Sequence, residues 1–159
     1  MQEQETIKSI PSDRLQFFPI MMFAIIMGLA GLSLVYKRIN EVLSFPSFIA
    51  TFMAILTTTL FFVILFFYIL KLIKHKNEVK KEFSHPIRIN FFAASSISIL
   101  ILSMVYRHNI DSLAQIFCIV GACLHIFFTF YTIKFWINNN LEMQHSNPAW
   151  FIPIVGNLI

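Results

Sequence analysis

The side chains that could do chemistry in this 159-residue sequence are few and widely spaced. Five histidines occur, none in the HxxxH or HExxH spacing that places two metal ligands on one helix face. Cys118 and Cys123 point about 140° apart on a helix, so they cannot pair with each other, and we interpret them as small packing residues. The sequence also lacks a Ser-His-Asp grouping, a glycine-rich phosphate loop and a CxxC pair. These patterns argue against an enzyme and against a metal or other cofactor.

His125 is the one titratable residue deep inside an apolar stretch. It could contact a proton or an anion in a pathway, or it could be a neutral histidine bonded to a neighbouring helix, and we prefer the second interpretation.

Carriers coupled to protons or cations usually hold an ionisable side chain at membrane depth. Anions can instead be stabilised by helix ends and by backbone broken at proline or glycine. Candidate breaks are residues 17–19, Pro148 and Pro153.

Long stretches without charge define the elements that carry these residues. Only 13% of residues are charged and 57% are apolar, whereas about a quarter are charged in a soluble domain. About 20 apolar residues suffice to cross a bilayer as a helix. The fold class is therefore an all-α, polytopic transmembrane helix bundle with four spans and the start of a fifth. We predict a polar cytoplasmic lead-in at 1–14 and a transmembrane domain at 15–159, with spans at about 15–36, 46–70, 89–106, 112–133 and 148–159.

The distribution of Lys and Arg predicts the orientation of the spans. The N-terminus, residues 71–88 and residues 134–142 hold 2, 6 and 1 of them, and the opposite side holds Lys37, Arg38 and Arg107. The positive-inside rule therefore places the N-terminus in the cytoplasm, which for a bacterial protein means the inner membrane. The basic segment 71–81 fits a cytoplasmic loop that contacts anionic lipid headgroups better than a nucleic-acid surface.

Residues that share a helical face predict where the spans touch one another. Small side chains let helix backbones approach closely, while bulky side chains face lipid, and such faces indicate packing more often than a pathway. In the second span the small or hydroxyl face comprises Ser47, Ala50, Thr51, Ala54, Thr57 and Thr58, and the other faces carry Phe48, Phe52, Leu56, Phe62 and Val63. In the fourth span it comprises Ala114, Cys118, Gly121, Ala122, His125, Thr129 and Thr132.

Three stretches resemble the tellurite-resistance/dicarboxylate transporter family, which includes the plant slow anion channels and belongs to the voltage-dependent anion channel superfamily. They are 18–31 (FPIMMFAIIMGLAG), 82–98 (EFSHPIRINFFAASSIS) and 148–157 (PAWFIPIVGN). Order and spacing both fit, and the resemblance covers the chain from residue 17 onward. The residues that match the family motifs are Phe18, Pro19, His85, Pro86, Pro148, Pro153 and Asn157.

The resemblance implies the first half of a ten-helix channel, built as five hairpins around a quasi-fivefold axis with the odd-numbered helices lining the pore. It implies transport of small inorganic anions and C4-dicarboxylates such as malate, with a link to tellurite resistance. Two departures stand out: helices six to ten, with the pore-occluding phenylalanine, are missing, and Ala-Ala-Ser stands at 93–95 where members often have a kinking proline. The implied pore-lining candidates are Pro19, Gly28, Gly31, Ser95, Ser96, Ser98, Pro153 and Asn157.

Two functional hypotheses follow from these patterns. The first is an anion channel or carrier subunit, present as an N-terminal fragment that needs its C-terminal half or a homo-oligomer in order to conduct. The alternative is a non-transporting membrane packing or assembly protein, or the remnant of a disrupted transporter gene. Both have membrane lipid as a partner, and neither involves nucleic acid.

Overall fold

The computed structural model describes residues 14–43, 46–107, 110–139 and 147–159, and in these ranges all regular structure is helical. This confirms the all-α prediction; the lead-in up to residue 13 lies outside the described residues. The first half of the chain forms the 3₁₀ helix η1 (Arg14–Phe17), α1 (Met22–Leu43), α2 (Ser47–Lys74) and α3 (Lys76–Phe83). The second half forms α4 (Asn90–Tyr106), α5 (Asp111–Asn138), η3 (Pro148–Trp150), α6 (Phe151–Val155) and η4 (Gly156–Leu158).

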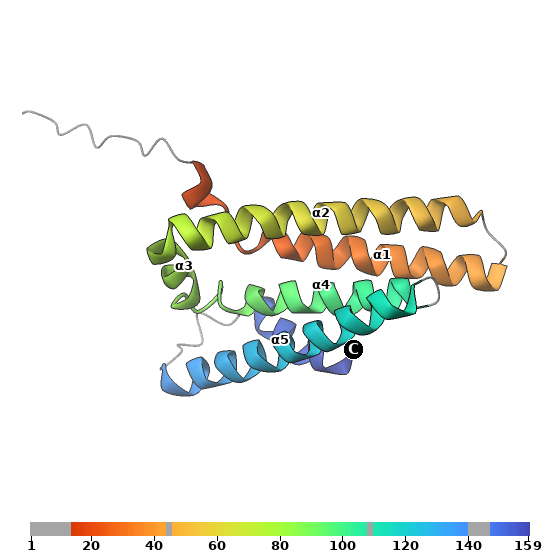
Figure 1. Cartoon of the computed structure of the whole chain (residues 1–159). Coiled ribbons are helices and arrows are strands. Elements are labelled where there is room, and N and C mark those ends of the chain that lie inside the picture. Colours follow the sequence, from red (N-terminus) through yellow and green to blue (C-terminus); the bar gives the residue numbers. More distant parts are fainter. Residues whose placement is uncertain (1–13, 44–45, 108–109, 140–146) are drawn as a thin grey trace, which may run out of the picture.

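The long helices form a bundle (Figure 1). Helix α1 packs against both α2 and α4, α4 packs against α5, and the short α6 contacts α4 and α5. Helix α3 lies across one end of the bundle, between α2 and α4, and we refer to this as the α3 end (Figure 1). In the described part of the chain, α1, α2 and α5 are long and apolar enough to cross a membrane, and α4 is a shorter apolar helix of 17 residues.

The first long helix starts later and ends later than the predicted span of 15–36. Pro19 explains the late start, because it lacks an N–H and disfavours helical geometry at the residue before it. The preceding residues form the separate turn η1 instead. At its other end α1 continues to Leu43, because no glycine or proline interrupts it after residue 36. The segment 71–88, predicted as a loop, contains the last turn of α2 and all of α3.

The core lies where α1, α2 and α4 meet. Phe23 of α1 packs edge-on against Phe61 and Tyr68 of α2, with ring centroids 6.1 and 5.9 Å apart, and Tyr68 in turn contacts Phe92 of α4 at 6.1 Å. Helix α4 is the most deeply enclosed, and Ala93 and Ala94 are fully buried. Small residues at these positions let the neighbouring backbones approach α4 closely.

The predicted faces of α2 are confirmed along the middle of that helix. Thr57 is buried at 1% exposure and its hydroxyl is hydrogen-bonded to that of Ser33 on α1, at 3.0 Å. All five bulky residues predicted to face lipid are exposed: Phe48, Phe52, Leu56, Phe62 and Val63. The prediction is wrong for Ser47 and Thr51, which are exposed. They line a cavity of ≈ 290 Å³ at the end of the bundle opposite α3, where α1 and α2 do not close on each other.

The predicted small face of α5 is buried at four positions: Ala114, Gly121, His125 and Thr132. Our interpretation of Cys118 and Cys123 as packing residues is wrong, because both are exposed free thiols. Cys118 lines an open cavity of ≈ 610 Å³ with Arg107 and Asp111.

Candidate functional site

The first family motif, Phe18-Pro19, marks the break before α1. The backbone carbonyl of Phe18 accepts a hydrogen bond from Nζ of Lys71 on α2, at 2.8 Å. The carbonyl of Pro19 accepts from the backbone N–H of Met22, at 3.2 Å. Carbonyls and N–H groups outside a regular helix need partners in an apolar setting. The lysine therefore stabilises the break that the proline causes.

The second motif, His85-Pro86, positions the start of α4. Nδ1 of His85 accepts hydrogen bonds from the backbone N–H groups of Ile87 and Arg88, at 3.2 and 3.4 Å. The fully buried side-chain amide of Asn90 donates to the carbonyl of Pro86, at 3.1 Å. Backbone N–H groups outside a regular helix need partners, and here an imidazole supplies one. The motif thus stabilises the turn that leads into α4.

The third motif holds the final helical segment against α5. Oδ1 of Asn147 accepts from the N–H of Ala149, at 3.0 Å, and Pro148 occupies the first helical position, where its missing N–H costs nothing. Further on, Nδ2 of Asn157 donates to the carbonyl of Pro153, at 2.7 Å, and lies 3.3 Å from the hydroxyl of Thr129 on α5. These bonds satisfy backbone groups where α6 gives way to a 3₁₀ turn.

The hydroxyl candidates on α4 are engaged within their own helix. Ser95, Ser96 and Ser98 each donate to a carbonyl three or four residues earlier, at 2.7 to 2.8 Å. Ser96 and Ser98 are fully buried and Ser95 is half-buried. Ser98 also lies 3.4 Å from the carbonyl of Phe23, at the contact between α4 and α1. In this arrangement the serines contribute to close helix packing.

His125 is the point where α4, α5 and the last segment meet. Its Nδ1 lies 3.0 Å from the hydroxyl of Ser96, which confirms the prediction of a bond to a neighbouring helix. Because Ser96 donates its one proton to α4, the ring nitrogen is assigned as the donor to Ser96. A Cβ built on Gly156 would lie 2.3 Å from Cε1 of His125. Only glycine therefore fits against this ring without displacing it.

The eight pore-lining candidates fall into groups with different surroundings. Gly28 and Gly31 face open space, since a Cβ added at either would meet nothing within 4 Å. Asn157 is exposed, and Pro19 is half-buried like Ser95. The remaining three, Ser96, Ser98 and Pro153, are buried in contacts between helices. The structure brings Ser96 and Pro153 toward α5 and leaves the α1 glycines apart from them.

A buried charge cluster at the α3 end was missed by sequence reasoning. Nζ of Lys71 lies 2.9 Å from Oε1 of Glu82, and both side chains are almost fully enclosed, at 2% and 4% exposure. The hydroxyl of Tyr68 donates to the other carboxylate oxygen, at 2.9 Å. We predicted Lys71 as a loop charge. The available signal was the position of Glu82 beside Val79 on one face of the amphipathic segment 76–83.

At the opposite end of the bundle, another lysine binds a helix terminus. Nζ of Lys37 on α1 donates to the carbonyl of Val105 in the last turn of α4. The hydroxyls of Thr58 and Tyr106 lie 2.8 Å apart and join α2 to the same end of α4. Helix α4 is therefore held at both ends by polar contacts from other parts of the chain.

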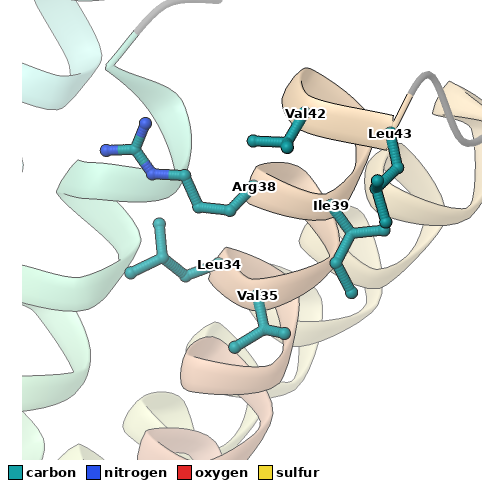
Figure 2. A pocket seen from close by; sticks show the side chains of 6 residues that line it. All are labelled: Leu34, Val35, Arg38, Ile39, Val42 and Leu43. Atoms are coloured by element: carbon teal, nitrogen blue, oxygen red, sulfur yellow. The ribbon is translucent and has the colours of Figure 1, made fainter.

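An apolar hollow near Lys37 is lined by residues of a single helix. Figure 2 shows it near the end of α1, and its volume is ≈ 460 Å³. The guanidinium of Arg38 is paired with Glu41 of the same helix, at 2.9 Å. Ligand sites are usually concave and combine convergent polar groups from several elements. This surface suits an acyl chain or another helix better, and its lining residues are Leu34, Val35, Arg38, Ile39, Val42 and Leu43.

The fold and the surfaces described so far define a helical integral membrane protein. The family model described as voltage-dependent anion channel matches residues 17–159, and the chain belongs to this family. It is 31% identical over 147 residues to an uncharacterized transporter of Methanocaldococcus jannaschii, covering 86% of this chain and 41% of that protein. It is 24% identical over 140 residues to the tellurite resistance protein TehA homolog of Haemophilus influenzae, covering 87% and 42%.

A plant relative shows a similar degree of likeness. The S-type anion channel SLAH2 of Arabidopsis thaliana is 33% identical over 134 residues, which cover 69% of this chain and 24% of the plant protein. The chain thus spans less than half the length of the curated relatives that it matches.

Proposed function

We propose that this chain is the N-terminal half of an anion channel or carrier, with four spans and the start of a fifth taken from a ten-helix quasi-fivefold bundle. Its substrates are small inorganic anions and C4-dicarboxylates such as malate, and its activity contributes to tellurite resistance. It lies in the bacterial inner membrane with its N-terminus in the cytoplasm. The family membership and the names of the relatives support transport of anions.

The observation that carries the proposal is the open, uncharged face of α1. Gly28 and Gly31 leave room beside the helix backbone, and no charged residue occurs between Met22 and Tyr36. Space without fixed charge suits a route in which backbone dipoles and hydroxyls replace part of an anion's hydration. A second half of the protein on this face would enclose the route.

The burial of three other candidates favours the alternative, a membrane packing or assembly protein without transport of its own. Ser96 and Ser98 are at 0% exposure, and Pro153 is also buried. Small residues also pack tightly between helices in membrane proteins that conduct nothing. The space beside Gly28 is open. The two functions therefore predict different results when this space is filled: transport should be obstructed, whereas a packing protein has no transport to lose.

Anion flux into liposomes distinguishes the two functions. We expect a version of full family length to conduct, and Gly28→Leu in it to reduce the flux at least tenfold while the yield of folded protein is unchanged. The matched control is Thr59→Leu, which adds bulk at an exposed position of α2. Equal flux in wild type and Gly28→Leu would contradict the pore-lining assignment of α1.

The chain of 159 residues alone is the second arm of this experiment. We expect no selective anion flux from it, because a half-ring of helices leaves the open face of α1 against lipid. Selective flux from this chain alone would contradict the proposal that it is a half, and would require a homo-oligomer that rebuilds the ring.

A further inference from the structure

Helix α3 has a buried face and exposed, charged positions. Its buried face consists of Val79 and Glu82, with Phe83 half-buried beside them. The exposed positions of α3 are mainly basic. They include Lys76, Lys80 and Lys81, and Lys74 at the end of α2 is also exposed.

The buried face fixes α3 to three other helices. Phe83 stacks on Phe92 of α4, with centroids 3.7 Å apart, and packs edge-on against Tyr131 of α5, at 5.4 Å. Glu82 is bound to Lys71 of α2, as described above. With three attachments α3 cannot rotate freely, so its lysines are held pointing away from the bundle. The basic surface therefore belongs to a helix that is fixed in the fold, and it does not depend on the conformation of a loop.

The position of α3 sets the depth of these lysines in a membrane. Helix α2 is long and apolar enough to cross a membrane and ends at Lys74, and α3 begins two residues later. Leu72 and Ile73, just before this point, are 46% and 64% exposed, as residues in contact with acyl chains are. The lysines therefore lie at and just after the end of the apolar helix α2, the position at which a membrane helix meets lipid headgroups.

One acidic residue shares this surface without cancelling its charge. Glu78 is paired with Lys81, with 2.6 Å between the charged atoms, and this hydrogen bond lowers the pKa of its carboxyl. The four lysines and one glutamate leave a net charge of +3 on a short surface. Charges of this sign near a bilayer attract anionic headgroups, by roughly fivefold in affinity per lysine.

We propose that α3 is a docking surface for anionic lipid headgroups, oriented by the Glu82–Lys71 pair. The headgroup phosphates bind between the exposed lysines, while the acyl chains lie along the exposed apolar end of α2. The proposal concerns a lipid partner and is independent of whether the protein transports anions.

Native mass spectrometry of the purified full chain tests the proposal, with phosphatidylglycerol or phosphatidylcholine added in detergent. We expect the wild type to retain phosphatidylglycerol in preference to phosphatidylcholine. The variant Lys74→Gln/Lys76→Gln/Lys80→Gln should lose roughly a hundredfold in affinity for phosphatidylglycerol, by the per-lysine factor above, and keep its affinity for phosphatidylcholine. This variant leaves the Lys81–Glu78 pair intact.

The matched control removes three exposed positive charges elsewhere: Arg38→Gln/Arg107→Gln/Lys134→Gln. It should retain phosphatidylglycerol as the wild type does. An equal loss in the control would show that only net charge matters and would overturn the proposal. Equal retention of the two lipids by the wild type, or unchanged retention by the α3 variant, would overturn it as well. Inorganic phosphate at the same concentration should not displace the lipid; displacement would identify a phosphate site instead.

Discussion

Lys71 of α2 and Glu82 of α3 form an ion pair of 2.9 Å that is shielded from solvent on nearly all sides. Removing two charges from water is costly, and their attraction compensates only when further hydrogen bonds complete the site. Here Tyr68 donates to the carboxylate and Lys71 donates to the carbonyl of Phe18. The pair therefore connects α2, α3 and the chain break before α1.

Single replacements in this pair should destabilise the fold strongly, because each leaves one charge buried without its counterion. We expect Lys71→Met or Glu82→Gln to lower the free energy of unfolding by about 3–5 kcal/mol, and the double variant to recover most of the loss. Unfolding titrations in mixed micelles would measure this. The exposed pair of Glu78 and Lys81 is the control, and its loss should change nothing measurable. Additive losses in the double variant would contradict this account.

A methyl group should have opposite effects at two glycines. At Gly156 it would lie 2.5 Å from Nε2 of His125 and 2.7 Å from Cδ1 of Ile97, so Gly156→Ala should cost about 1–3 kcal/mol of stability through overpacking. At Gly28 it meets nothing within 4 Å, so Gly28→Ala should stabilise α1 by about 0.5–1 kcal/mol. Thermal unfolding in detergent would compare them. Equal effects at both positions would refute the close contact at His125.

The hydroxyls of Ser33 and Thr57 should couple α1 to α2 energetically. They lie 3.0 Å apart and both residues are at 1% exposure. Polar contacts between membrane helices contribute about 0.6 kcal/mol on average. A double-mutant cycle of Ser33→Ala and Thr57→Val should give a coupling energy of about that size. Thr59→Val, which alters an exposed hydroxyl bound only within α2, should show no coupling to Ser33→Ala.

The side of the membrane on which α3 lies can be tested at an exposed residue of that helix. We expect Asn77→Cys, in a background without Cys118 and Cys123, to resist impermeant thiol reagents in intact cells and to react after lysis. The prediction follows from the excess of Lys and Arg on the N-terminal side. Labelling of position 77 from outside intact cells would reverse the orientation. Position 107, replaced by cysteine, serves as the control that should react from outside.

Hydrophobic runs and helical faces predicted most of the fold, because lipid requires backbone groups to be satisfied within helices. Thr57 and His125 were placed correctly for that reason. The start of α1 was missed by several residues, since the effect of Pro19 depends on whether a partner such as Lys71 is available for the freed carbonyl. That partner comes from a helix 53 residues away in sequence, and periodicity carries no information about such contacts.

For the candidate site, the sequence identified the motifs but could not assign their roles. His85 and Asn157 are polar residues at motif positions, and either could have faced a pathway. In the structure His85 accepts a hydrogen bond from the turn before α4, and Asn157 donates one to the carbonyl of Pro153. The open setting of Gly28 and the buried setting of Ser96 depend on how helices pack, which a single sequence leaves undetermined.

Two lysines near the ends of the membrane helices stabilise the fold, because Lys37 binds the end of α4 and Lys71 binds the break before α1. During biosynthesis the same side chains also help to determine which way the helices insert. Experiments that move positive charge to invert a topology would therefore alter folding and insertion together at these positions. Lys74 and Lys76, which are exposed, would report on insertion without that interference.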